Sequence, residues 1–199
     1  MIHLYCTSCT DLPPRAQLLA CMPPVRQARL SQTDADSGAL AAYGLLDFAL
    51  WRHYALSAAC VQYTAADKPY LTGNPVFLSL SHTKTHALCA LAPFPVGCDI
   101  ESHRPISQRT AARILGADES PAAFFDYWTL KESFIKLYAP NKLPPHEITF
   151  TVKNDRAARH NAHGRLFRQI PNCTIAIAAQ NPFPKPNLQL VEHKEFLIS

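Results

Sequence analysis

Prolines divide this chain into short segments. The sequence has 199 residues, with 17 prolines but only 6 glycines. A proline inside a helix or a central strand removes a backbone hydrogen bond, so long uninterrupted elements are excluded wherever prolines occur. The pairs Pro13-Pro14 and Pro23-Pro24 bracket one such short segment near the N-terminus. The pattern predicts stiff connections between many short elements.

Hydrophobic periodicity predicts two long helices. In 36–57, apolar residues recur at steps of three and four, and Ser37 is a candidate cap. A second helix is predicted over 121–138, with Pro121 in its first turn and Pro140 ending it. Shorter helical segments are expected at 15–22 and 107–115, and strands at 2–6, 76–80, 87–91, 96–101, 148–153, 166–170, 174–179 and 188–191. Helices combined with mostly hairpin-connected strands in each half predict an α+β fold.

Composition limits the class of protein. With 48% hydrophobic and 17% charged residues, the chain can bury a core as one domain or as two small lobes. We find neither a membrane-spanning stretch nor a signal peptide and expect a cytoplasmic protein without a membrane partner. The net charge of +4 agrees with an anionic ligand or an acidic partner. The chain lacks the dense basic patches of a nucleic-acid binder, so no nucleic-acid partner is expected.

The seven cysteines predict thiols and not a disulfide framework. Their number is odd, and no secretory signal accompanies them. Cys6 and Cys9 have the spacing of half a zinc site, but no second ligand pair follows. We therefore expect structural, mostly buried thiols.

Two carboxylates on a predicted strand form the first candidate site. Asp99 and Glu101 are two residues apart, so their side chains project from one face of the strand. Paired carboxylates on an otherwise apolar strand need a cation, and oxygen ligands suit Mg²⁺. The alternative is a strand end that emerges into solvent at 101–104.

The helix at 127–136 carries a third carboxylate and a lysine. Glu132 and Lys136 are four residues apart, on one helical face. Glu132 would complete a metal shell, and Lys136 could hold a phosphate oxygen. The alternative is a surface ion pair of small energetic value.

Further candidate ligands are cations and a histidine in the first half. Ser81-His82 lies in a turn between two predicted strands, Lys68 precedes Pro69, and Arg26 and Arg29 follow a proline pair. A structural histidine and solvated surface cations are the alternatives.

Taken in order, four motifs resemble the 4′-phosphopantetheinyl transferases, specifically the larger, monomeric Sfp type. They are Lys68-Pro69, Ser81-His82, the strand V-G-C-D-I-E at 96–101, and the helix W-T-L-K-E-S-F-I-K at 128–136. The resemblance spans about residue 26 to about residue 180. Its specificity comes from the combination of a G-x-D-x-E strand with a W-x-x-K-E-S-x-x-K helix some thirty residues later.

The resemblance implies a reaction. Such enzymes transfer the 4′-phosphopantetheine arm of coenzyme A to a serine of an apo acyl or peptidyl carrier protein and release 3′,5′-ADP. Asp99, Glu101 and Glu132 would hold Mg²⁺. Glu132 would also take the serine proton, and Lys136 would contact a phosphate near the reacting bond. These roles match what attack of a hydroxyl on a pyrophosphate requires.

The resemblance also implies how coenzyme A is bound. The implied contacts are nucleotide phosphates for Ser81 and His82, the adenine side for Lys68 and Pro69, the 3′-phosphate for Arg26 and Arg29, and a phosphate for Lys136. One departure is the absence of the family's arginine before the first long helix, where this chain reads D-S-G-A-L at 36–40. That absence weakens the case for one 3′-phosphate contact.

The implied architecture is two similar α+β lobes, 1–100 and 101–199, related by a pseudo-twofold axis, with the active site in the cleft between them. The carrier protein would dock on 104–125 and on the stretch after Lys136. Carrier proteins are acidic, and the available cations are Arg104, Arg109, Arg113 and Lys142. The pathway would be fatty acid or secondary metabolite biosynthesis, and the enzyme would act as a monomer.

Three alternatives remain open at this stage. The first is a degenerate homologue that binds carrier protein or coenzyme A without catalysis, supported by the missing arginine. The second is another Mg²⁺-dependent phosphoryl-transfer enzyme or nuclease that uses three carboxylates. The third is a hydrolase built on Cys89 or Cys98, which lacks any context that would activate the nucleophile.

Overall fold

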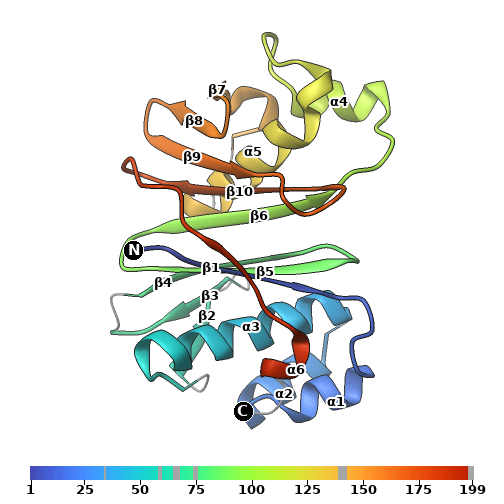
Figure 1. Cartoon of the computed structure of the whole chain (residues 1–199), viewed down its shortest axis with the longest axis vertical. Helices are drawn as coiled ribbons and strands as arrows, with labels where there is room; N and C mark the ends of the chain where they lie inside the picture. The colour runs from blue at the N-terminus through green and yellow to red at the C-terminus, as the bar shows by residue number, and fades with distance from the viewer. Residues whose placement is uncertain (34, 58–59, 65–67, 74–75, 139–142, 197–199) are drawn as a thin grey trace. The chain divides into compact units, whose positions relative to one another are not determined.

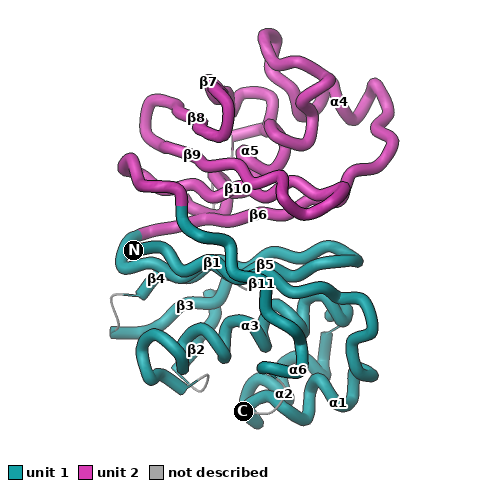
Figure 2. Tube along the Cα trace, viewed as in Figure 1, with its two compact units in different colours: residues 1–94, 186–199 teal, residues 95–185 magenta. Residues whose placement is uncertain are grey.

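The chain divides into two units, coloured separately in Figure 2: residues 1–94 with 186–199, and residues 95–185. The structure is a computed structural model, and it describes every residue except 34, 58–59, 65–67, 74–75, 139–142 and 197–199. The lobes expected from the sequence were 1–100 and 101–199. The second unit instead starts at 95 and ends at 185. Strand β6 (Val96–Ser102) begins the second unit, and the C-terminal segment belongs to the first.

The first unit is a sheet covered by helices. Its sheet has the order β11-β1-β5-β4, with β1 antiparallel to β5 and parallel to β11. The long helix α3 packs against β5, β4 and β1 (Figure 1). The elements are β1 (His3–Ser8), α1 (Arg15–Ala20), α2 (Pro24–Ser31), α3 (Ser37–Tyr54), β2 (Val61–Tyr63), β3 (Pro69–Leu71), β4 (Phe77–His82), β5 (His86–Ala92), β11 (Leu188–Leu190) and α6 (His193–Phe196).

Helix α3 begins one residue away from its predicted cap. The Asp36 carboxylate, and not the Ser37 hydroxyl, accepts the Ala39 N–H at 2.8 Å. Asp36 has the extended backbone of an N-cap residue, whereas Ser37 is already helical. Helix α2 was not predicted at all, although Pro24 stands in its first turn, which is a favoured position for proline.

The second unit is an antiparallel sheet with α5 (Phe124–Tyr138) on one face. The sheet order is β6-β10-β9-β8-β7, and α5 packs on β6 and β10. Leu130, Phe134 and Leu137 of α5 join the buried core of this unit. The remaining elements are α4 (Gln108–Ile114), η2 (Pro121–Ala123), η3 (Pro145–Glu147), β7 (Thr151–Lys153), β8 (Arg156–Arg159), β9 (Ala162–Phe167) and β10 (Cys173–Ala179).

Helices beside several sheets confirm the predicted α+β class. The strand expected at 148–153 begins only at Thr151, because residues 145–147 form a 3-10 turn after consecutive prolines. The strand expected at 166–170 is β9, which starts earlier at Ala162, and β8 was missed. Pro140, the predicted end of the second long helix, lies outside the described residues. None of the helices in the described part of the chain combines the length and the apolar character needed to cross a bilayer.

All seven cysteines are thiols, as expected from the sequence, but they differ in exposure. Cys6, Cys89, Cys98 and Cys173 are buried, Cys9 is half-buried, and Cys21 and Cys60 are exposed. Burial, assisted by the charge of Asp36, raises the pKa of the Cys9 thiol to about 12.

We expect a thiol reagent to separate these cysteines by rate. At pH 8, Cys21 and Cys60 should react with DTNB first, and Cys9 should react far more slowly because so little of it is thiolate. Peptide mapping after a short pulse of iodoacetamide checks the assignment. Rapid labelling of Cys9 in a Cys21→Ser/Cys60→Ser variant would contradict it.

Candidate active site

Strand β6 directs Asp99 and Glu101 toward α5. The two residues alternate with buried Cys98 and Ile100, so they share a face of the strand. Asp99 is only 4% exposed, and Lys136 of α5 donates from Nζ to its Oδ1 at 2.7 Å. This contact identifies the face as the one that α5 covers.

Gly97 explains how α5 comes so close to β6. It lies two residues before Asp99, on the same face of the strand. A Cβ atom at Gly97 would stand 1.9 Å from the backbone oxygen of Ser133 and 2.6 Å from the backbone nitrogen of Leu137. Only a residue without a side chain fits there, because both neighbouring atoms belong to the helix backbone. The glycine therefore allows the turn of α5 that carries Lys136 to lie against the carboxylate strand.

The charges of this site act on one another. Burial raises the pKa of Glu132, the negative charges of Asp99 and Glu101 raise it further, and Lys136 partly offsets both effects. For Lys136, burial alone would lower the pKa, but Asp99 and Glu132 hold the ammonium charged and raise its pKa overall. The three predicted carboxylates thus interact electrostatically, with Lys136 among them.

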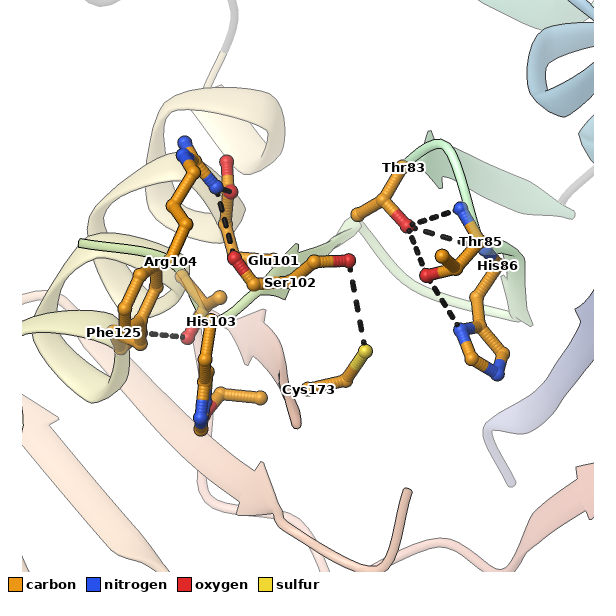
Figure 3. Close-up of polar contacts among 11 residues, drawn as sticks. Thr83, Thr85, His86, Glu101, Ser102, His103, Arg104, Phe125 and Cys173 are labelled. Carbon is orange, nitrogen blue, oxygen red and sulfur yellow. Dashed lines mark hydrogen bonds and ion pairs between the residues drawn. The ribbon is translucent and has the colours of Figure 1, made fainter. Parts of the chain in front are cut away.

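Glu101 is held by Arg104, which follows it on the chain. Arg104 donates to Glu101 Oε2 at 2.7 Å and to the Ser102 carbonyl at 2.9 Å (Figure 3). Its guanidinium also lies near the rings of Phe125 and Trp128. The strand end therefore does not simply emerge into solvent, since Glu101 is mostly buried and paired.

Carboxylate oxygens are donors that suit a hard cation, but in this structure two of the three carboxylates pair with side-chain cations of the chain itself. Within the described residues, no three His, Cys, Asp or Glu side chains are grouped closely enough to hold a metal. Asp99 is paired with Lys136 and Glu101 with Arg104. In chemical type the carboxylate oxygens suit Mg²⁺, which usually shares its ligand shell with substrate phosphates.

In the first unit, Ser81 and His82 end β4 beside the start of α3. His82 Nε2 lies 3.3 Å from Asp36, the residue that caps α3. A Cβ on Gly38, in the first turn of α3, would lie 3.0 Å from the His82 ring. Ser81 is buried and His82 is partly exposed. A histidine at a helix N-terminus is a favourable place for a phosphate.

Arg29, Lys68 and Pro69 gather at the β2–β3 hairpin. The Arg29 guanidinium lies 4.0 Å from the ring centre of Tyr63, and Tyr63 is paired with Pro69 in the hairpin. Lys68 immediately precedes β3; its carbonyl accepts the Thr64 N–H at 2.9 Å, and its own N–H donates to the Thr64 hydroxyl at 3.1 Å.

Arg26 does not join this group at the surface. It is 2% exposed, and its guanidinium forms an ion pair with Asp47 of α3. Burial opposes its charge, but Asp47 outweighs that effect and raises the pKa of Arg26. The ion pair of Arg26 with Asp47 therefore links α2 to α3. Of the two predicted arginines, Arg29 is the more available to a ligand.

Sequence reasoning missed several contributors to the site. Asp36 was not recognised as the partner of His82, and Arg104 was not recognised as the partner of Glu101. The pairing of Asp36 with His82 was missed because the predicted cap of α3, Ser37, lies one residue after the observed cap. The second could have been found from the i, i+3 spacing of opposite charges at a strand end. Lys142, a predicted docking cation, lies outside the described residues.

Comparison with known proteins agrees with this geometry. The sequence profile described as the 4′-phosphopantetheinyl transferase superfamily matches residues 95–178, which include both β6 and α5. The chain is 24% identical to 4′-phosphopantetheinyl transferase Sfp of Bacillus subtilis (strain 168) over 168 residues, covering 73% of this chain and 75% of that protein. It is 38% identical to 4′-phosphopantetheinyl transferase psf-1 of Bacillus pumilus over 82 residues, 35% of each chain. It is 30% identical to 4′-phosphopantetheinyl transferase gsp of Aneurinibacillus migulanus over 98 residues, 44% of this chain and 41% of that protein.

The part of the chain that contains β6 and α5 is the part that the family profile matches. Residues 95–178 are similar to the 4′-phosphopantetheinyl transferase superfamily, and the relatives that match the chain are enzymes of the Sfp type.

Proposed function

We propose that the protein transfers the 4′-phosphopantetheine arm of coenzyme A to a serine of an apo acyl or peptidyl carrier protein and releases 3′,5′-ADP, with Mg²⁺. The observation that carries this proposal is the meeting of three coupled carboxylates and one lysine where α5 crosses β6. Both reacting partners need such groups, because the pyrophosphate of coenzyme A must be neutralised and the serine of the carrier protein must lose a proton.

Lys136 and Glu132 would carry out the chemistry of the chain itself. The Lys136 ammonium, kept charged by Asp99, would pair with a phosphate oxygen as charge develops there. Glu132 would accept the serine proton, directly or through water. A carboxylate with a raised pKa is a stronger base, which suits this role. Asp99, Glu101 and Glu132 would hold Mg²⁺, which would neutralise the pyrophosphate; to do so, Glu101 would release Arg104.

The first unit would bind the nucleotide. We assign the phosphates to Ser81 and His82, which end β4 beside the start of α3, and the adenine side to Lys68 and Pro69. Arg29 is assigned to the 3′-phosphate, because Arg26 would first have to leave its buried pair with Asp47. This assignment requires two lobes that face each other across a cleft, in the pseudo-twofold arrangement implied by the resemblance.

The carrier protein would dock on the second unit along 104–125, where Arg109 and Arg113 of α4 are exposed. We propose a cytoplasmic, monomeric enzyme that serves fatty acid or secondary metabolite biosynthesis.

A mass assay tests the transfer directly. The purified protein, coenzyme A, Mg²⁺ and an apo carrier protein should give a carrier heavier by one phosphopantetheine group. Excess EDTA should abolish the gain, and added Mg²⁺ should restore it, because three carboxylates without a cation repel a pyrophosphate. Unchanged mass with every acyl and peptidyl carrier tested would reject the proposal, and full activity in EDTA would reject its metal.

A degenerate homologue that binds without transfer is the second candidate. The observations that favour it are the absence of an arginine in 36–40 and the burial of Arg26 against Asp47, which together reduce the cations available to a 3′-phosphate. Calorimetric binding of coenzyme A or of carrier protein with no mass gain would identify this case.

A further inference from the structure

Strands β7, β8 and β9 carry a row of cations on one face of the sheet in the second unit. Lys153 of β7 is paired with Arg156 of β8, and Arg156 is paired with Arg165 of β9. Residues directly opposite each other in antiparallel strands point to the same face. The three side chains therefore form a cation row across neighbouring strands, at the end of the sheet that is far from β6 (Figure 1).

The cation row lies on the face that α5 does not cover. Val152, Ala157 and Gly164 are paired across the same three strands, one position along from the cations. Val152 and Ala157 pack in the core that includes α5, and a Cβ on Gly164 would lie 2.6 Å from a side chain of α5. Because side chains alternate along a strand, the cations point the other way. Lys153 and Arg156 are exposed there.

A fourth cation stands beside the row. Arg165 donates to the Phe183 carbonyl at 2.9 Å, which holds its guanidinium against the segment that follows β10. Lys185 of that segment has its Nζ 2.9 Å from an oxygen of Asp155 and 4.8 Å from the ring centre of Phe167. Phe167 is two residues after Arg165 in β9, so both lie on one face. Lys185 therefore adds its charge on the face of the cation row.

Acids offset only part of this positive charge. Asp155, in the turn between β7 and β8, pairs with Lys185 and lies 3.9 Å from Arg165. The pKa of Asp155 is lowered, chiefly by the hydrogen bond from Lys185. In the described part of the chain, neither Lys153 nor Arg156 lies close enough to a carboxylate to form an ion pair. These two exposed cations are therefore not compensated.

The register of the strands keeps like charges together. Only Asn154 and Asp155 separate Lys153 from Arg156, so the tight turn holds the two cations opposite each other. Like charges directly opposite in a sheet are destabilising, whereas opposite charges are stabilising. A surface that brought carboxylates to the cation row would remove this repulsion.

Spacing and charge indicate which anionic surface fits. Neighbouring strands are about 4.8 Å apart, so the cations recur at about that step. Carboxylates on one face of a helix recur about every 5.4 Å, the pitch of the helix. Residues on one face of an extended strand recur only about every 6.7 Å. An acidic helix laid along the row matches best, and Asp155 would repel the continuous phosphate backbone of a nucleic acid.

We propose that the cation row of Lys153, Arg156 and Arg165, with Lys185 beside it, is a docking surface for an acidic helix of a partner protein. The helix would carry Asp or Glu side chains one turn apart. The surface uses none of the residues assigned above to coenzyme A, Mg²⁺, proton transfer or carrier docking, and the inference does not depend on transferase activity.

Two helical peptides of equal composition test the spacing. Both are built from alanine and glutamine with three glutamates, placed at i, i+4 and i+7 on one face in the first peptide and at i, i+2 and i+5 around the helix in the second. We expect the first to bind with a Kd on the order of a millimolar at about 20 mM salt, shifting the Lys153, Arg156 and Arg165 amide signals in ¹⁵N-HSQC spectra. The second should bind at least about threefold more weakly. Salt at about 300 mM should abolish the shifts, because it screens exposed charges.

Arg156→Glu removes the centre of the cation row without harming the sheet. The new carboxylate would stand between Lys153 and Arg165, and opposite charges in register stabilise neighbouring strands. We expect the peptide shifts to disappear in a protein whose Tm is unchanged or higher by up to about 3 °C. Lys84→Glu is the matched control, because it makes the same charge change at an exposed position of the first unit, and it should bind the peptide normally.

The proposal is overturned if no amide of β7, β8 or β9 shifts, if the two peptides bind equally, or if Arg156→Glu binds as well as Lys84→Glu. Binding of duplex DNA or phosphatidylglycerol vesicles through Arg156, without binding of the peptide, would assign the row to phosphate and also overturn it. Competition by an apo carrier protein for the peptide would overturn a separate partner. None of these measurements uses coenzyme A or transfer, so their failure leaves the transferase proposal unaffected.

Discussion

Glu132→Gln is expected to lower the rate of phosphopantetheine transfer by about 10³-fold, the typical loss when a general base is removed. The amide keeps the shape of the side chain but can neither accept the serine proton nor contribute a charge to a Mg²⁺ site. Carrier mass followed over time, with coenzyme A and Mg²⁺ in excess, measures the rate. Asp99→Ala should have a similar effect, because Lys136 would lose its partner at 2.7 Å as well as a metal ligand.

Glu132→Gln should not destabilise the fold, and the dependence of its stability on pH gives a second test. Burial and the charges of Asp99 and Glu101 raise the pKa of Glu132 above that of the unfolded chain. The folded state therefore binds more protons in that window, so the wild type loses stability as pH rises through it. Glu132→Gln removes this loss. In metal-free buffer its Tm should equal or exceed the wild-type Tm at neutral pH, and the difference should vanish below the unfolded pKa.

Glu147→Gln is the matched control, because Glu147 is a half-exposed carboxylate outside the proposed site. It should change neither the rate nor the Tm. Full activity in both Glu132→Gln and Asp99→Ala would show that the carboxylates have been assigned to the wrong reaction. A large drop in Tm for Glu132→Gln would instead point to a structural role for that carboxylate.

Local patterns predicted the elements of the site well. Asp99 and Glu101 are on a strand, and Glu132 and Lys136 are on a helix, as alternation and periodicity indicated. Such patterns fix which side chains share a face of their own element. They do not fix which element lies opposite, so the pairing of Lys136 with Asp99 needed the structure.

Charge partners were the part that sequence could not supply. Arg26 reads as a surface cation near a proline pair, yet it is buried and paired with Asp47, 21 residues later, in the middle of α3. Lys131 belongs to the motif helix, yet it is turned away from Glu132 toward Glu119. Neighbouring residues on a helix point about 100° apart, so one motif can serve two different surroundings.

Gly97→Ala is expected to destabilise the second unit by about 3 kcal/mol or more, the upper range for inserting a methyl group into a packed interior. The reason is geometric, because the new Cβ would lie 1.9 Å from the Ser133 oxygen and 2.6 Å from the Leu137 nitrogen. Neither atom can move unless the whole of α5 moves. Thermal unfolding followed by circular dichroism should show a Tm lower by roughly 10 °C.

Gly164→Ala is the matched control for this prediction. Gly164 is also on a strand beneath α5, but the close contact of its added Cβ, at 2.6 Å, is with Cδ2 of Leu130, the end of a side chain that can rotate. We expect a smaller loss, about 1 kcal/mol. Any folded Gly97→Ala protein should also transfer slowly, since a displaced α5 carries Glu132 and Lys136 away from Asp99. If Gly97→Ala is as stable and as active as Gly164→Ala, close packing of α5 on β6 is not what brings the carboxylates and the lysine together.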